Sequence, residues 1–410
     1  MNWLLRDGRL LGRDGVCDVA IREGRIVSID EHLSFEGDGR ELDLEGRFVV
    51  PGFVDAHMHL DKAYALDDAA FCSACSLDEA VEAFIEWREG ITPEHVYRNA
   101  RRVARAALSH GTVALRTHVT VDSQVGLSWL EPLMRLRDEL QSELTIQVVA
   151  LPDTEEVVDG TARPLLRDAV DAGADLIGGA PHMVARYRHV INELVDLAGM
   201  CGCDLDLHVD ETDDPSSNSL EYLADRKMTT GFKGTVTAAH CCALSALDNR
   251  SAERVIEKVA AASINIVTLP SCNLYLGGRD DRGLVRRGLT RVRELQVAGV
   301  NVAFASDNIR DAFNPFGTGD MLQQLLIAAH ALHLGTSAEL ETGLDMGTRN
   351  AAQILGLKDY GLQPGNVASL VVLDDSDLGS AVARVAPRRY VFSNGELVAQ
   401  TRVEQDFVYD

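Results

Sequence analysis

Between residues 50 and 356, short apolar runs alternate with longer amphipathic stretches. Buried strands of a parallel sheet carry nearly continuous apolar sequence, whereas surface helices repeat apolar residues every three or four positions. Helical stretches include Leu77–Trp87, Pro93–Ser109, Val190–Cys201 and Ala252–Ala262. The pattern predicts eight strands, at Phe53–His59, Thr112–Val121, Thr145–Pro152, Ala174–Ala180, Asp204–Val209, Thr235–Cys241, Asn265–Leu269 and Asn301–Asp307. Eight strands with helical crossovers indicate an α/β fold, a (β/α)8 TIM-like barrel whose active site lies at the C-terminal strand ends.

Both ends of the chain follow a different pattern. Segments such as Arg25–Asp30 and Arg389–Ser393 alternate apolar and polar residues between turns rich in Gly, Asp and Asn. This alternation is typical of antiparallel strands with one solvent-facing side. We therefore expect two domains: a small β-sandwich built from both termini, residues 1–49 and 357–410, and a catalytic barrel, residues 50–356.

The charge balance excludes some partners. The chain has 39 Lys and Arg residues against 63 Asp and Glu residues, a formal charge of −24. Such a charge repels phosphate backbones and anionic lipid, which argues against nucleic-acid and membrane-surface binding. No apolar run approaches the ~20 residues of a membrane helix, and no leader segment is recognisable, so we expect a soluble cytoplasmic protein.

The eight cysteines include two closely spaced pairs, Cys72 with Cys75 and Cys201 with Cys203. A zinc ribbon needs two pairs that each enclose a two-residue gap, and these spacings do not match it. We expect reduced, mostly buried thiols instead.

Two histidines end the first predicted strand. Alternate side chains of a strand point the same way, so His57 and His59 face one side together and can grip one cation. Later strands also end in polar residues, among them His208 and Asp307. Burying such groups without partners costs several kcal/mol, and a metal site explains their gathering. The predicted ligands are three imidazole nitrogens and one carboxylate oxygen, from His57, His59, His208 and Asp307.

Other histidines need no such role. His110, His118 and His182 are expected to be core residues with satisfied hydrogen bonds, although His118 and His182 could also line the pocket.

The motifs together resemble the amidohydrolase superfamily, and within it cytosine deaminase. The resemblance covers nearly the whole chain and is carried by PGFVDAHMHLD at Pro51–Asp61 and by the stretches Arg116–Val119, Ile146–Ala150, His208–Asp214, Gly288–Arg293 and Pro315–Gln323. It implies a metal-dependent enzyme of nucleobase metabolism, with iron or zinc, and suggests a homo-oligomer. The fourth predicted strand has no lysine to bridge two metals, which implies one divalent ion per subunit.

The expected chemistry is hydrolytic deamination of a free cytosine-like or related amino-oxo N-heterocycle. A metal-bound hydroxide would attack the amino-bearing ring carbon and release ammonia. His240 and Asp307 would orient the hydroxide and accept its proton, while Glu211 would protonate the adjacent ring nitrogen. The alternative role for Glu211 is a carboxylate that orients His208.

Some substrate positions depart from the cytosine deaminase pattern. By alignment, the family's binding Gln becomes Asp153, its second strand-eight Asp becomes Asn308, and a pocket Trp becomes Phe313. Residues 306–311 and Lys62 instead look like N-isopropylammelide aminohydrolase. Lys62 either reaches a ring oxygen or a substrate carboxylate, or pairs with a surface acid.

Three functions therefore compete. The first is the deaminase. The second is an N-alkylamino-triazine aminohydrolase or a cyclic amide hydrolase on the same metal site. The third is a silent binding barrel, against which the complete ligand set and the proton-transfer residues Glu211 and His240 argue.

Overall fold

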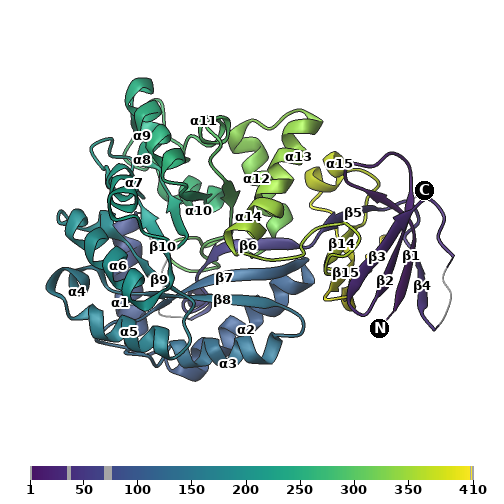
Figure 1. Ribbon diagram of the computed structural model, residues 1–410, viewed down its shortest axis with the longest axis horizontal. Helices are drawn as coiled ribbons and strands as arrows, with labels where there is room; N and C mark the ends of the chain where they lie inside the picture. Colours follow the sequence, from purple (N-terminus) through teal and green to yellow (C-terminus); the bar gives the residue numbers. More distant parts are fainter. Residues whose placement is uncertain (1, 35–37, 69–75, 407, 409–410) are drawn as a thin grey trace.

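Eight parallel strands form the centre of the molecule in a computed structural model that describes residues 2–34, 38–68, 76–406 and 408 (Figure 1). The strands pair in chain order, from β6 to β13. Asp307 closes the ring, because its N–H donates to the carbonyl of His57 at 2.9 Å and its carbonyl accepts from the N–H of His59 at 3.3 Å. The strands are β6 (Phe53–Met58), β7 (Thr112–Thr120), β8 (Thr145–Leu151), β9 (Leu176–Gly179), β10 (Asp204–Val209), β11 (Val236–His240), β12 (Asn265–Thr268) and β13 (Val302–Phe304).

All eight strand predictions are confirmed, and each observed strand lies within its expected range. The observed strands are often shorter at their C-terminal ends. At or just after the ends of β10, β11 and β13 the backbone turns into the left-handed region, with φ of 49° at Asp210, 67° at His240 and 61° at Asp307. A non-glycine residue in this conformation is strained, and such residues cluster at functional sites.

Helices cover the outside of the barrel (Figure 1). In α2, Thr92 caps the first turn by accepting from the N–H of His95, and Pro93 occupies the first helical position. The helices are α1 (Leu77–Arg88), α2 (Pro93–Ser109), α3 (Leu130–Leu140), α4 (Thr154–Asp159), α5 (Ala162–Asp171), α6 (Tyr187–Cys201), α7 (Ser219–Thr230), α8 (Ala243–Ala246), α9 (Asn249–Ala261), α10 (Pro270–Leu276), α11 (Val292–Val297), α12 (Met321–Leu332), α13 (Ser337–Met346), α14 (Arg349–Ile354) and α15 (Leu378–Ala383), with 3₁₀ turns η1 (Ala65–Asp67) and η2 (Pro181–Met183). None of the described helices is both long and apolar enough to cross a membrane.

Strands from both termini form a second, mixed sheet beside the barrel (Figure 1). The first half of β1 pairs with β4 and its second half with β5, so this strand joins two halves of the sheet. The rings of Trp3 on β1 and Phe392 on β15 pack edge to face, with centroids 5.3 Å apart. The predicted fold class is thereby confirmed. The strands are β1 (Trp3–Leu10), β2 (Cys17–Arg22), β3 (Arg25–Asp30), β4 (Arg40–Asp43), β5 (Phe48–Pro51), β14 (Leu370–Leu373), β15 (Arg388–Ser393) and β16 (Glu396–Gln400).

A buried arginine connects this terminal sheet to the barrel. Arg388 of β15 donates from Nε to the carbonyl of His110 at 3.0 Å and forms an ion pair with Asp320, the N-cap of α12. The division into residues 1–49 with 357–410 and residues 50–356 remains our proposal. Its first boundary, between residues 49 and 50, falls within β5, and β6 begins shortly after β5 ends.

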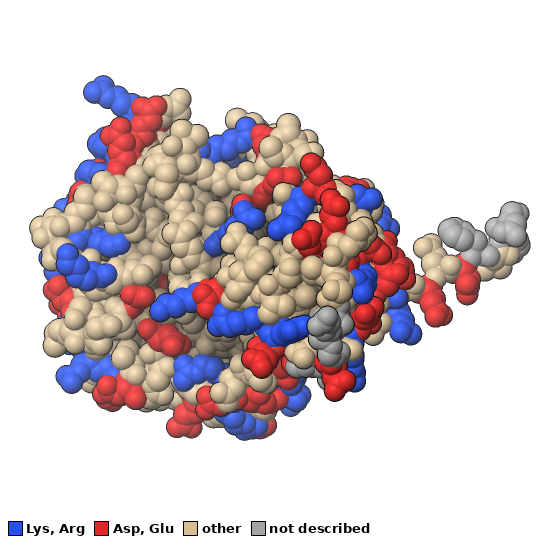
Figure 2. All heavy atoms as spheres, turned by 45° about the vertical axis from the view of Figure 1, so that its right-hand side comes forward, with Lys and Arg blue, Asp and Glu red and all other residues tan. Residues whose placement is uncertain are grey.

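The surface mixes both signs of charge. Figure 2 shows acidic and basic side chains next to one another over one face of the molecule, with no continuous basic surface on that face. The six described cysteines are free thiols, and Cys72 and Cys75 lie outside the described residues.

Candidate metal centre and active site

Polar side chains line the inside of the barrel on three strands. Strand residues alternate between the two faces, so every second side chain points inward. The inward series comprises buried residues of β6, β7 and β10 with their flanking positions, namely Asp55, His57, His59, Arg116, His118, Thr120, Asp206 and His208. Of this series, only His57, His59, His118 and His208 were singled out from the sequence as candidate site residues.

The four predicted metal ligands lie together at the strand ends. The Nε2 atoms of His59 and His208 are 3.1 Å apart, and Oδ1 of Asp307 lies 3.4 Å from Nε2 of His59 and 3.7 Å from Nε2 of His57. One ligand atom from each of His57, His59 and His208 lies within 4.8 Å of the other two. The arrangement can hold one cation.

Unsatisfied buried atoms support this fit. Both ring nitrogens of His57, Nδ1 of His208 and both carboxylate oxygens of Asp307 have no hydrogen-bond partner among the described residues. Burial lowers the pKa of His59 and His208 well below the usual value, so both imidazoles are neutral and keep an electron pair for a metal. A cation would compensate buried groups that are otherwise costly.

Asp206 is a residue that the sequence analysis missed. Its Oδ1 lies 3.7 Å from Nδ1 of His57 and 3.5 Å from Nε2 of His118, and its Oδ2 accepts from Arg116 at 2.8 Å. Burial alone would raise the pKa of Asp206, but the nearby imidazoles of His118 and His57 and the charge of Arg116 hold it well below the usual range. Asp206 and His208 are two positions apart on one strand, and this spacing could have predicted that both side chains face the inside of the barrel.

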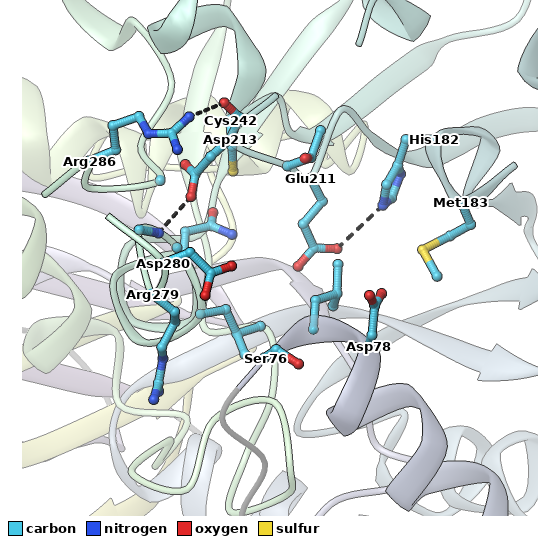
Figure 3. Close-up of a pocket in the computed structure, with 17 residues that line it drawn as sticks. Ser76, Asp78, His182, Met183, Glu211, Asp213, Cys242, Arg279, Asp280 and Arg286 are labelled. Atoms are coloured by element: carbon cyan, nitrogen blue, oxygen red, sulfur yellow. Dashed lines mark hydrogen bonds and ion pairs between the residues drawn. The ribbon is translucent and has the colours of Figure 1, made fainter. Parts of the chain in front are cut away.

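Glu211 projects into a cavity of about 390 Å³ at the mouth of the barrel (Figure 3). Its Oε1 lies 3.3 Å from Nδ1 of His240, and its Oε2 lies 4.0 Å from Nε2 of His182. Asn273 also approaches Nδ1 of His240, at 3.0 Å. Burial first, and the nearby charge of Asp307 second, raise the pKa of Glu211 well above its usual value.

His118 and His182, which could be either core residues or pocket residues by sequence, both lie at the candidate active site. His182 lines the cavity beside Glu211, and Nδ1 and Nε2 of His118 have no hydrogen-bond partner among the described residues. The idea of satisfied core histidines therefore does not describe His118. His110 lies elsewhere, next to Arg388, and burial lowers its pKa to about 4.

Three of the predicted substrate residues gather beside Asp307. The ammonium of Lys62 lies 4.3 Å from the ring centroid of Phe313, and Lys62 is only 8% exposed, so pairing with a surface acid does not explain it. Asn308 donates to Asp311 at 2.7 Å, and Asp311 also accepts from the N–H of Phe313. Burial raises the pKa of Asp311 to about 6.

Asp153 lies apart from this group. Its carboxylate caps α4 by accepting from the N–H groups of Glu155 and Glu156 at 2.9 and 3.3 Å. It lines a second cavity, of about 250 Å³, rather than the cavity that contains Glu211.

The comparisons with known proteins agree on one family. The amidohydrolase family model matches residues 40–131 and 124–399. N-isopropylammelide isopropyl amidohydrolase of Pseudomonas sp. (strain ADP) is 31% identical over 98% of both chains. Pterin deaminase of Rhizobium rhizogenes is 33% identical over 93% of this chain and 87% of its own.

Solved structures extend the likeness to the fold. The 5-methylcytosine deaminase from Klebsiella pneumoniae, liganded with 5-fluorocytosine, superposes with a TM-score of 0.90 at 32% identity over 99% of both chains. The N-isopropylammelide isopropylaminohydrolase from Burkholderia multivorans gives a TM-score of 0.86 at 29% identity over 98% of both chains. The predicted resemblance is confirmed: the chain belongs to the amidohydrolase family, whose members are metal-dependent, and is a hydrolase that acts on C–N bonds.

Proposed function

We propose that this chain is a metal-dependent hydrolytic deaminase of a free amino-oxo N-heterocycle and releases ammonia. The observation that carries the proposal is the position of Glu211. Its carboxyl group points into the cavity (Figure 3) and lies 3.3 Å from Nδ1 of His240. The ring of His240 in turn stacks on that of the candidate ligand His208, with centroids 5.2 Å apart. A protein that only binds a ligand has no need for a buried proton donor at this place.

We assign the metal to His57, His59, His208 and Asp307. Three nitrogens and one oxygen suit either Fe²⁺ or Zn²⁺, and we propose one ion per subunit. Such an ion would lower the pKa of a bound water to near neutrality and so supply a nucleophile.

The proton transfers fall to side chains of the chain itself. His240 and Asp307 each offer an atom within the same 4.8 Å cluster as His57, and we assign them to orient the water and accept its proton. Asn273 and Glu211 both face Nδ1 of His240, which leaves Nε2 to face the reaction. His240 is neutral because burial lowers its pKa well below the usual value. We assign its hydrogen to Nδ1, with the amide of Asn273 turned so that the amide oxygen accepts it, and Nε2 can then take up a proton.

Glu211 serves as the acid. Because burial raises its pKa, the carboxyl group carries a proton that it can give to the ring nitrogen next to the attacked carbon. The water oxygen bonds to the ring carbon, the exocyclic C–N bond breaks, and the nitrogen leaves with the transferred protons as ammonia.

The substrate ring class is inferred from relatives and from the pocket. The names of three similar proteins refer to 5-methylcytosine, a pterin and N-isopropylammelide, which are all nitrogen heterocycles with an exocyclic amino group. We propose that Lys62, buried against Phe313, donates to a ring oxygen, and that Asn308 contacts the ring edge. Asp153 remains a predicted substrate contact.

A second candidate releases an alkylamine instead of ammonia. It is favoured by the identity of 31% over 98% of the chain to N-isopropylammelide isopropyl amidohydrolase. The proposed metal ligands and the acid Glu211 would catalyse this reaction in the same way, because only the leaving group, an alkylamine instead of ammonia, differs.

Product analysis separates these candidates. Iron- and zinc-loaded protein is incubated with cytosine, 5-methylcytosine, pterin and N-isopropylammelide, and ammonia, alkylamine and ring-opened acid are measured. Ammonia from one ring class supports the deaminase, alkylamine supports the second candidate, and a ring-opened acid points to cyclic amide hydrolysis. Activity that survives removal of the metal by a chelator would contradict all three.

A further inference from the structure

A second cavity, called here the side cavity, lies next to the one that contains Glu211. It has a volume of about 250 Å³ and is built from one face of α1, the ends of β7 and β8 and the segment around η2. Its lining residues are mostly apolar, and those used below are Val81, Phe84, Ile85, Leu151, Pro152 and Met183.

The side cavity adjoins the proposed reaction centre. Met183 lines both cavities and follows His182, which faces Glu211 (Figure 3). On the other side, the ring of Phe84 lies 5.2 Å from the ammonium of Lys62, which in turn lies over Phe313. A molecule held between Lys62 and Glu211 therefore has the side cavity beside it.

The apolar face of α1 over this cavity is incompletely packed. Val81, Phe84 and Ile85 follow the three- and four-residue spacing of a helix face, yet Val81 and Phe84 are only half-buried and Ile85 is 41% exposed. Of the described residues in α1, only Ala80 is buried. Apolar surface of this kind gains free energy when a ligand removes it from water.

Three of the four charged residues that line the side cavity already have partners. Arg88 forms an ion pair with Asp122, and Asp153 caps α4. The fourth, Glu155, is exposed to solvent. The less exposed part of the wall therefore offers a ligand mainly apolar contact.

We propose that the side cavity is a subsite for an apolar alkyl substituent on the heterocycle. The chain then acts best on a substituted ring and less well on the bare one. This inference rests on the proposed function for its substrate ring, and it adds the part of the substrate that does not react.

The first test compares bare and substituted rings. For each ring class that the enzyme hydrolyses, kcat/KM is measured for the parent and for its methyl and isopropyl derivatives at each free ring position. One position should improve by about fourfold for each added carbon, the gain expected from burying a methylene group. Hydrolysis of the parent with no gain at any position would overturn the subsite and leave the deaminase standing.

Two variants of α1 provide the matched control. Val81→Phe fills the side cavity, whereas Glu82→Phe adds the same ring to an exposed position of the same helix. Val81→Phe should lower kcat/KM for the best substituted ring at least tenfold and change that of the bare ring less than threefold, and Glu82→Phe should change neither. Equal losses for both rings in Val81→Phe would contradict the proposal.

A binding signal tests the subsite without turnover. The ring of Phe84 lies 6.2 Å from that of Trp87 and 6.1 Å from that of Trp129, and the third tryptophan, Trp3, lies in the terminal sheet. In a Trp3→Phe, Glu211→Gln protein, the isopropyl derivatives should change the tryptophan emission saturably and more strongly than the parent rings. An unchanged emission with every derivative would overturn the subsite even if no ring is hydrolysed.

Discussion

The Nδ1 atom of His57 faces the Oδ1 atom of Asp206 at 3.7 Å, while its Nε2 atom faces Asp307. A carboxylate behind a metal-binding histidine fixes the ring orientation and makes the other nitrogen a better ligand. We therefore expect Asp206→Asn to weaken metal binding about 10- to 100-fold, as is usual for the loss of such a partner.

Competition with a chelator measures this affinity directly. Asp204→Asn removes a carboxylate from the same strand at a half-buried position away from His57 and should leave metal affinity unchanged. Equal affinities in Asp206→Asn and the wild type would refute the positioning role.

Glu211→Gln should keep the metal and lose turnover by about 10²- to 10⁴-fold, the range that one acid or base contributes. The amide keeps the size of the carboxyl group but has no acidic proton to give. Metal analysis and steady-state rates check this prediction, with His208→Ala as the comparison that should lose both metal and activity. Wild-type rates at full occupancy in Glu211→Gln would assign the proton transfer elsewhere.

Acid should destabilise the protein partly through His110. Its pKa is about 4 in the fold, against about 6.5 when free, so the unfolded chain binds more protons between these values. Stability therefore falls as the pH drops from about 6.5 to about 4, by at most about 3 kcal/mol from this group. Urea midpoints at pH 7 and 4.5 should differ less in His110→Gln than in the wild type. The exposed His32 gives the control, since His32→Gln should leave the difference unchanged.

Arg388→Met should destabilise the junction between terminal sheet and barrel. The variant leaves Asp320 buried without its charge partner, and removal of one member of a buried pair typically costs about 3–5 kcal/mol. By contrast Arg135 and Glu94 form an ion pair whose side chains are 56% and 72% exposed, and Arg135→Met should cost less than about 1 kcal/mol. Thermal melting of both variants checks the contrast, and similar midpoints would contradict it.

The strands and the four candidate ligands could be predicted because local patterns specify them. Apolar runs mark buried barrel strands, and the two histidines of β6 share a face by simple alternation. The same alternation places Asp206 on the face of His208, but the residues around Asp206 in the sequence include no charge partner for a buried carboxylate. A buried carboxylate within a strand is acceptable here only because Arg116, from a strand far away in the sequence, donates to it.

Asp153 illustrates the opposite case. Alignment predicts a substrate contact, whereas the local sequence, an Asp followed by Thr154, Glu155 and Glu156, is a typical helix start. In the structure the carboxylate caps α4 and faces the side cavity. Which cavity a residue lines depends on how neighbouring loops pack, and that is not encoded in one short motif.

The position of β5 has a consequence for synthesis. This strand pairs with β1 on one side and with β14 on the other, and β14 comes from the opposite end of the chain. A ribosome therefore releases β1 and β5 long before the strand that covers the free edge of β5 exists. Such an edge can pair with other chains, so a product that stops before residue 370 would expose it next to the strand that carries His57.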